Sequence, residues 1–236
     1  MQILNIAGYK FTTLDNLSEL RISLLNKCEE LTLKGTILLS PEGINITLAG
    51  TLTDVNAFKA QLTANSSFSD MTFRESYSTN QPFKRLKVKL KKEIITFRQP
   101  EICPETQRAP AVSPQQFKQW LDQGRELTIL DTRNDYEIEF GTFANATKLH
   151  IQDFCEFPQA AENLPTDKPV VMFCTGGVRC EKAGVHLLNK GFSEVYQLDG
   201  GILNYFAIEG GAHYEGACFV FDERIALDPN LQPITQ

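Results

Sequence analysis

The chain has 236 residues, enough for one large domain or two ordinary ones, and its 42% hydrophobic and 22% charged content is that of a globular protein. No apolar run approaches the roughly 18 residues that a membrane-spanning helix needs, and the N-terminus lacks the basic and apolar segments of an export signal. We therefore expect a cytoplasmic protein without a membrane partner. Its six cysteines have neither a disulfide framework nor paired metal-ligand spacing, which predicts reduced thiols and no metal site.

The net charge of −6 is distributed unevenly along the chain. Residues 1–99 contain 13 Lys and Arg against 9 Asp and Glu, a net charge of +4. The remainder contains 10 against 20, a net charge of −10. Such asymmetry suggests an anionic partner for the basic half.

The first 97 residues show strand and helix patterns in the order strand, helix, strand, strand, helix, strand. This order is typical of a small ferredoxin-like (acylphosphatase-like) α+β domain, which we place at residues 1–97. The stretch Thr51-Leu52-Thr53-Asp54 has the chemistry of an N-cap for the second helix. The expected strands lie at 2–9, within 33–50 on both sides of a turn at 41–43, and at 71–77; the expected helices lie at 14–31 and from Thr51 to about Leu62.

Residues 83–97 alternate apolar and basic side chains through their middle, which predicts a further strand with Leu86, Val88 and Leu90 facing the core. Six positive charges lie within nine residues of this segment: Lys84, Arg85, Lys87, Lys89, Lys91 and Lys92. Lysines on an edge strand protect it against aggregation, whereas a basic strip can bind nucleic-acid phosphates. The pattern leaves both interpretations open and slightly favours edge protection.

Residues 98–112 contain three prolines and little periodicity, so we expect the interdomain linker there. Residues 113–236 then alternate strands and helices, which predicts an α/β domain with a parallel sheet and a site at its carboxyl edge. The expected helices lie at 115–123, 180–190 and 202–208, the expected strands at 127–130, 170–173 and 194–198, and an apolar run at 217–227 is expected to pack back on the domain as a C-terminal extension.

Residues 170–192 predict a buried strand, a tight loop that Cys174 opens, and a helix with Gly191 as its C-cap. A cysteine at this position lies near a helix N-terminus, and two glycines let backbone N–H groups turn toward its sulfur. Both effects favour the thiolate. We therefore predict that Cys174 is a catalytic nucleophile. Its active-site loop consists of Thr175, Gly176, Gly177, Val178 and Arg179.

Only four residues separate Cys174 from Arg179. Cysteine-dependent phosphatases use a longer loop to surround a phosphate, so this smaller loop suits a sulfur atom or a small polarised group. An inert structural cysteine is the alternative interpretation. The glycine pair, the arginine and the strand–loop–helix context together favour the reactive one.

The segments LTILDTRNDYEIEFGTF, FCTGGVRCEKA and VYQLDGGI are similar to a rhodanese domain. Together with KGTILLSPEGIN and CFVFDER, they resemble the tRNA uridine hydroxylase family over nearly the whole chain. The resemblance implies oxygen-dependent conversion of the wobble uridine of tRNA to 5-hydroxyuridine, with tRNA as partner and molecular oxygen as co-substrate. It maps the family's essential cysteine to Cys174 and its Asp-Thr-Arg motif to Asp131, Thr132 and Arg133.

Four residues are expected to support Cys174: Asp131, Arg133, Glu137 and Cys180. Arg133 is either a substrate contact or one half of an ion pair with Glu137 that shapes the loop, and we favour the ion pair. Cys180 is either a resolving thiol for an oxidised Cys174 or an inert buried residue. The remaining cysteines, Cys28, Cys103, Cys155 and Cys218, are expected to be inert, and His150 and His186 to be structural.

Three hypotheses about function follow. The leading one is a tRNA hydroxylase in which Cys174 adds to carbon 6 of a flipped-out uridine so that carbon 5 takes oxygen; oxygen delivery from an oxidised Cys174 is the competing route. The rhodanese segments fit equally well a sulfurtransferase with a persulfide on Cys174. A silent binding module is disfavoured by the intact cysteine. No organic cofactor and no obligate protein partner are inferred.

Overall fold

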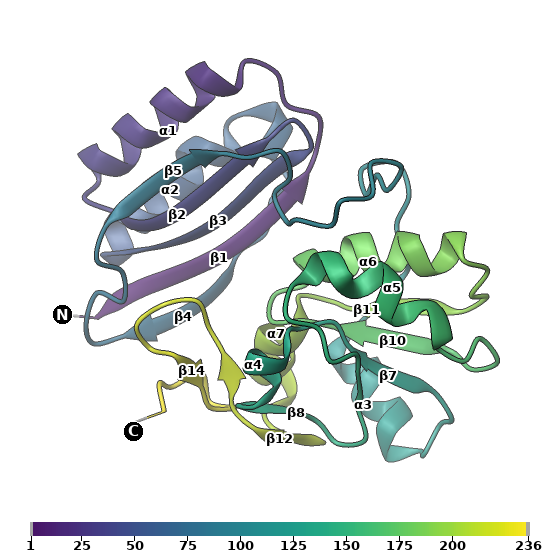
Figure 1. Ribbon diagram of the computed structural model, residues 1–236. Coiled ribbons are helices and arrows are strands. Elements are labelled where there is room, and N and C mark those ends of the chain that lie inside the picture. Colours follow the sequence, from purple (N-terminus) through teal and green to yellow (C-terminus); the bar gives the residue numbers. More distant parts are fainter. Residues whose placement is uncertain (1, 235–236) are drawn as a thin grey trace. The chain divides into compact units, whose positions relative to one another are not determined.

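The computed structural model describes residues 2–234 and divides into two compact units, one up to Ile95 and one from Thr96 onward (Figure 1). Each unit has its own sheet and its own hydrophobic core. Within residues 2–234, every helix is too short or too polar to span a lipid bilayer.

The N-terminal unit is a five-stranded sheet in the order β4-β1-β3-β2-β5. Its elements in chain order are β1 (Ile3–Phe11), α1 (Leu17–Glu30), β2 (Lys34–Ser40), β3 (Gly43–Gly50), α2 (Leu52–Thr63), a 3-10 turn (Ser66–Phe68), β4 (Arg74–Ser78) and β5 (Leu86–Leu90). β3 is antiparallel to both β1 and β2, and β4 is antiparallel to β1. This arrangement confirms the predicted ferredoxin-like α+β fold.

Alternate strand residues face the two helices and form the core of this unit. Ile44 and Ile46 of β3 are buried together with Leu24 of α1 and Phe58 of α2. The predicted N-cap is confirmed, because the Thr51 hydroxyl oxygen accepts a hydrogen bond from the third backbone N–H of α2.

β5 adds an edge strand, parallel to β2, to the ferredoxin-like sheet. Val88 faces the core as predicted and is buried. The prediction for Leu90 is wrong, because its side chain is 43% exposed. An edge strand has a neighbour on one side only, so the last side chain of β5 lacks the cover that a central strand provides.

The C-terminal unit has a parallel sheet in the order β6-β11-β10-β7-β9. Its elements are β6 (Ala111–Val112), α3 (Pro114–Asp122), β7 (Thr128–Asp131), α4 (Asp135–Ile138), β8 (Gly141–Phe143), β9 (Thr147–Lys148), 3-10 turns (Phe154–Glu156 and Ala161–Asn163), α5 (Phe157–Ala160), β10 (Val170–Phe173), α6 (Val178–Asn189), β11 (Val195–Leu198), α7 (Gly201–Glu209), β12 (Tyr214–Gly216), β13 (Cys218–Phe219) and β14 (Ala226–Leu227). The predicted α/β architecture with a parallel sheet is confirmed.

Two details differ from the sequence-based expectation. Residues 111–112, predicted as the end of the linker, form β6, which pairs with β11. α6 begins at Val178 rather than near residue 180, because Gly177 with φ 103° redirects the chain immediately after the loop.

Helices cover both faces of the parallel sheet, as burial of such a sheet requires. On one face Phe117 of α3 and Tyr205 of α7 pack with Val171 of β10. On the other face α6 approaches so closely that a Cβ on Gly184 would lie 3.1 Å from the Met172 side chain. The faces are therefore filled, and the carboxyl edge of the sheet is where side chains converge.

Candidate active site

Cys174 lies at the carboxyl edge of the parallel sheet, directly after β10. The last residue of β10, Phe173, pairs with the last residue of β7, Asp131. Thr132 joins the two strand ends, because its backbone N–H and its hydroxyl both donate to the Phe173 carbonyl, at 3.1 and 3.0 Å. The residues after the two strands are thereby held side by side.

The loop after β10 turns backbone N–H groups toward the Cys174 sulfur. The Gly177 N–H donates to Sγ at 3.1 Å, and α6 begins at the next residue, so the positive end of its dipole lies beside the sulfur. Cys174 is only 1% exposed. The loop therefore encloses the sulfur in a field that favours an anion.

The first turn of α7 holds the opposite side of this loop. The Ile202 N–H donates to the Cys174 carbonyl at 2.9 Å, and the Leu203 N–H donates to the Thr175 carbonyl at 3.1 Å. Gly201 has φ 66°, and a Cβ there would lie 2.3 Å from the Cys174 carbonyl oxygen. The sequence analysis missed this role of Gly201. The only signal for it was the glycine pair after the strand at 194–198.

The surroundings of Cys174 keep its sulfur deprotonated at neutral pH. Burial alone raises the pKa of Cys174, but three influences outweigh it: a hydrogen bond with Cys180, the charge of Arg179, and the N–H groups of Arg179 and Gly177. Together they lower the pKa of Cys174 to about 5. The thiolate is the form of cysteine that attacks electrophiles.

Arg179 connects the loop to α4 through a buried ion pair with Glu137. Nη1 donates to Oε2 at 2.5 Å and Nη2 donates to Oε1 at 2.7 Å. The positive charge of Arg179 also favours the Cys174 thiolate and lowers the pKa of Cys174. Burial raises the pKa of Glu137, but Arg179 more than offsets this and holds that pKa below its usual range. The guanidinium therefore has fixed partners on both sides.

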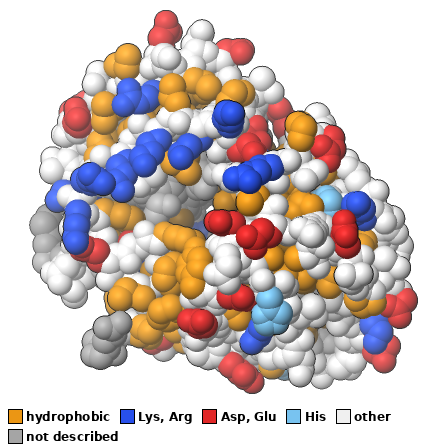
Figure 2. Space-filling model, in the orientation of Figure 1, with side chains coloured by type: hydrophobic (Ala, Val, Ile, Leu, Met, Phe, Trp, Pro, Cys, Tyr) orange, Lys and Arg blue, Asp and Glu red, His pale blue; other side chains and the backbone are white. Residues whose placement is uncertain are grey.

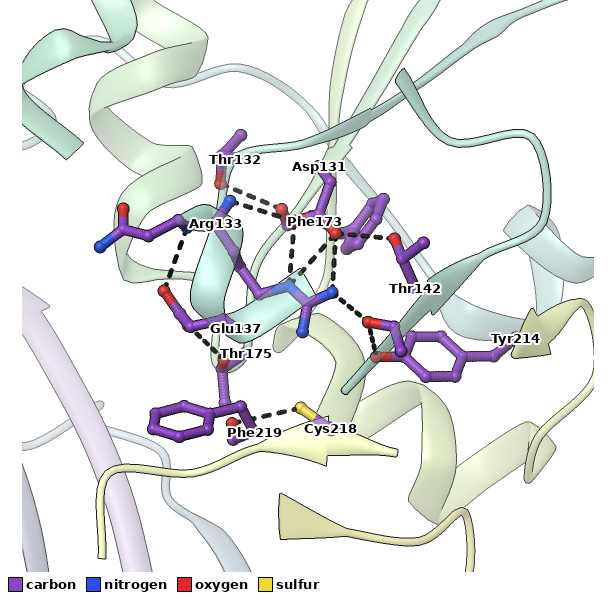
Figure 3. A network of polar contacts seen from close by, with 12 residues as sticks. Asp131, Thr132, Arg133, Glu137, Thr142, Phe173, Thr175, Tyr214, Cys218 and Phe219 are labelled. Carbon is purple, nitrogen blue, oxygen red and sulfur yellow. Dashed lines mark hydrogen bonds and ion pairs between the residues drawn. The ribbon is translucent and has the colours of Figure 1, made fainter. Parts of the chain in front are cut away.

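The predicted ion pair between Arg133 and Glu137 is wrong, because Glu137 pairs with Arg179. Arg133 pairs instead with Asp131 (Figure 3). Arg133 Nε and Nη2 lie 2.9 and 2.7 Å from the two Asp131 carboxylate oxygens. Nη2 also donates to the Gly141 carbonyl at 2.6 Å. Arg133 is wholly buried, so this pair fixes the turn after β7.

Cys180, in the first turn of α6, is the thiol that hydrogen-bonds Cys174. It is completely buried, and its sulfur lies 3.7 Å from the Thr132 hydroxyl. Burial raises the pKa of Cys180, and the neighbouring Cys174 thiolate raises it further. At neutral pH the pair therefore consists of one thiolate and one thiol.

Two parts of the chain match known domain families. Residues 3–94 match the UPF0176 acylphosphatase-like domain, and residues 113–207 match the rhodanese-like domain. The tRNA uridine(34) hydroxylases of Cupriavidus taiwanensis and Cupriavidus pinatubonensis are 53% and 52% identical, over 99% of this chain and 86% of each relative. That of Thiobacillus denitrificans is 50% identical over 99% of this chain and 98% of the relative. The chain belongs to the tRNA uridine(34) hydroxylase family.

The two candidate sites of this tRNA uridine(34) hydroxylase family member lie in different domains. Cys174 and the groups around it lie within the rhodanese-like domain. The basic strip, defined as residues 84–92, lies along β5 in the acylphosphatase-like domain. Lys87 is half-buried, and the other charged members are exposed: Lys84, Arg85, Lys89, Lys91 and Lys92. Figure 2 shows Lys and Arg side chains in a row across this part of the molecule.

Other cysteines and a buried histidine have the surroundings of structural residues. Burial raises the pKa of Cys28 and of Cys218 to about 12, so neither forms a thiolate at neutral pH. His186 packs edge-on against Phe97 and Phe157, with ring centroids 5.9 and 6.1 Å apart. These contacts suit the predicted structural roles.

Proposed function

We propose that this chain hydroxylates the wobble uridine of tRNA, with Cys174 as the catalytic residue and molecular oxygen as co-substrate. The observation that supports this best is a buried thiolate, with its pKa lowered to about 5, in a loop of backbone N–H donors. It occurs in a member of a family whose named relatives act on uridine 34 of tRNA. We place the reaction in the cytoplasm, where tRNA is used.

The proposed chemistry begins with addition of the Cys174 thiolate to carbon 6 of uracil. Addition there converts the ring into an enolate and makes carbon 5 nucleophilic. Carbon 5 then takes oxygen, and loss of the carbon 5 proton and of the Cys174 thiolate restores the ring double bond. The base must leave its stack to reach the sulfur, and extrusion is inexpensive for an unpaired anticodon base.

Backbone N–H groups of the loop or the Arg179 guanidinium are proposed to stabilise the enolate oxygen. The guanidinium pairs with Glu137, and the Gly177 N–H donates to the Cys174 sulfur. A Cβ built on Gly176 would meet no atom within 4 Å, so the loop is open on the side of Gly176. Donors aimed at a developing oxyanion are worth about 3 kcal/mol each in such sites.

We also propose that the basic strip binds tRNA phosphates. Its members are mostly exposed and lie on the edge strand β5 or within two residues of its ends, so several can follow the backbone of one RNA segment. Five residues are proposed to make these contacts: Lys84, Arg85, Lys87, Lys89 and Lys91. Protection of the β5 edge remains compatible with the same placement.

Replacement of Cys174 by Ala or Ser tests the catalytic role. Both variants are expected to lose 5-hydroxyuridine formation completely while they retain the fold, and Cys103→Ser, which changes an exposed cysteine, is expected to keep full activity. Full activity in Cys174→Ala would contradict the proposal. A tRNA that contains 5-fluorouridine tests the addition step, since direct attack predicts a covalent adduct at Cys174 and oxygen delivery from an oxidised sulfur does not.

A sulfurtransferase is the second candidate function, because residues 113–207 match the rhodanese-like domain. In that case Cys174 carries a persulfide to an acceptor. Mass spectrometry of digested tRNA from cells with and without the gene separates the two functions. Loss of an added oxygen from uridine supports hydroxylation, whereas loss of a thio-modification supports sulfur transfer.

A further inference from the structure

Cys180 is a buried thiol that the steps above do not use, although it touches the reacting sulfur. Cys174 and Cys180 are 1% and 0% exposed, and both are reduced. Gly177 bridges them: its N–H donates to the Cys174 sulfur at 3.1 Å, and its carbonyl accepts the Cys180 N–H at 3.0 Å. Gly177 thus links two buried, reduced cysteines, and the enclosed site contains a dithiol.

Hydroxylation by molecular oxygen has an electron requirement that a single thiolate catalyst does not meet. One oxygen atom enters uridine and the other must be reduced to water, which takes two electrons. Cys174 alone leaves the reaction as the thiolate that entered it. A dithiol that closes to a disulfide releases two electrons.

We propose that the Cys174–Cys180 dithiol is the internal two-electron reductant of each hydroxylation and ends each turnover as a disulfide. This inference rests on the proposed function. It assigns to Cys180 a chemical step, reduction of the oxygen–oxygen bond, in place of a packing role.

The step balances as follows. Oxygen adds to carbon 5 of the Cys174–uridine enolate and forms a peroxide anion. The Cys180 sulfur takes the outer oxygen, so an S–O bond forms, the O–O bond breaks, and the Cys180 proton passes to the oxygen that stays on carbon 5. The carbon 5 proton then passes to the Cys180 sulfenate as the bond between carbon 6 and Cys174 breaks.

The released Cys174 thiolate then attacks the Cys180 sulfur. The S–S bond forms, the S–O bond breaks, and hydroxide leaves. Uridine, oxygen, the Cys174 thiolate and the Cys180 thiol have become 5-hydroxyuridine, a disulfide and hydroxide, which takes a proton from solvent to become water. An external thiol reductant restores the dithiol by exchange before the next turnover.

The surroundings of Cys180 suit this step. Burial and the neighbouring Cys174 thiolate raise the pKa of Cys180 and outweigh the opposing contact with the Thr132 hydroxyl, 3.7 Å from its sulfur. Cys180 therefore keeps the proton that the step requires. Burial of both sulfurs limits further oxidation of the sulfenic acid, which favours its capture by Cys174.

The test is a turnover experiment on the full chain, reduced and then freed of reductant, with oxygen and a tRNA that has an unmodified wobble uridine. We expect a single 5-hydroxyuridine per chain, formed together with one Cys174–Cys180 disulfide, and renewed turnover when a thiol reductant is added. Trypsin cuts after Arg179, between the two cysteines, so mass spectrometry detects the disulfide as two joined peptides. Product formed while both thiols remain reduced would overturn the inference.

Cys180→Ser separates the redox role from a structural one, because a hydroxyl retains hydrogen bonding to Cys174 but cannot form a disulfide. This variant should still form the 5-fluorouridine adduct, which shows that the fold and the addition step are intact. It should make no 5-hydroxyuridine without reductant and recover slow product with excess small thiol, whereas Cys103→Ser should match the unaltered chain. A full equivalent of product from Cys180→Ser without reductant would refute the proposal.

The same experiment distinguishes failure of this inference from failure of the proposed function. If the unaltered chain makes no 5-hydroxyuridine even with reductant and oxygen, the hydroxylase function itself is wrong and the inference falls with it. If it makes multiple products per chain without reductant, the hydroxylase function stands and only the dithiol proposal is overturned.

Discussion

The Cys174 loop and the basic strip on β5 are two candidate sites of opposite construction. In the loop, Cys174 and Arg179 are buried, and Arg179 pairs with buried Glu137 of α4. Most charges of the strip are exposed, on the edge strand β5 or beside its ends. A buried charge must be paired, and its partners therefore specify which atoms can react. A solvated charge needs no fixed partner, so the strip indicates only a class of ligand, a polyanion.

The largest expected effect of the buried surroundings is on the pKa of Cys174, which they lower to about 5. The ultraviolet thiolate absorbance that distinguishes the unaltered chain from Cys174→Ser should persist as the pH falls from 8 and disappear only near the folded pKa. An unfolded thiol titrates near pH ~8.5. Because the folded pKa is the lower of the two, the thiolate stabilises the fold fully above pH ~8.5. This contribution to the free energy of unfolding is lost as the pH falls through the folded pKa. A difference signal that disappears already near pH ~8.5 would show that the loop does not stabilise the thiolate.

The next largest effect is expected from Glu137→Gln, which removes the carboxylate that neutralises buried Arg179. Breaking one side of a buried ion pair costs about 3–5 kcal/mol of unfolding free energy. Trp120, the only tryptophan, lies in α3 and reports unfolding of the C-terminal unit by fluorescence during urea titration. Glu139→Gln is the control, because it changes an exposed carboxylate directly after α4, the helix that contains Glu137. It should change the free energy of unfolding by no more than about 0.5 kcal/mol. Equal shifts in the two variants would contradict the assigned role of the pair.

Gly201→Ala should have a smaller but localised effect. Gly201 has φ 66°, and its Cβ would lie 2.3 Å from the Cys174 carbonyl oxygen, so both the backbone and the loop must shift. Gly124→Ala is the matched control, because Gly124 has φ 63° and open space around its Cβ. Positive φ alone costs about 1–3 kcal/mol in either variant. Only Gly201→Ala should also reduce 5-fluorouridine adduct formation, and an equal reduction in both would show that Gly201 does not position the loop.

Local patterns predict the elements of the candidate site well. The strand at 170–173, the loop after it and the helix that follows are adjacent in sequence, so apolar runs and glycines are sufficient to predict them. The Thr51 cap is local for the same reason. Each of these features depends on residues within a few positions of one another.

Ion pairs and strand pairings between distant segments could not be predicted from the sequence. Glu137 lies close to Arg133 in sequence but pairs with Arg179, 42 positions away, because the parallel sheet brings the ends of β7 and β10 together. β6 has only two residues and forms because β11 offers it a free edge, so no local pattern distinguishes it from the linker. Partners of this kind follow from the topology of the sheet.

The smallest expected effect comes from the basic strip, and it decides between edge protection and RNA contact. Lys87 and Lys89 lie on β5, and the double variant Lys87→Glu with Lys89→Glu keeps charge on the edge, so protection against aggregation is retained. If both lysines contact phosphates, tRNA affinity falls and the slope of log affinity against log salt is reduced by roughly two.

The matched control, Lys168→Glu with Lys190→Glu, makes the same charge change at exposed positions of the C-terminal unit, and it should leave the slope close to that of the unaltered chain. Filter binding at several salt concentrations measures both. Unchanged tRNA affinity at low salt in the strip variant would assign Lys87 and Lys89 to edge protection. The basic strip would then be a structural edge, and the Cys174 loop would be the functional site.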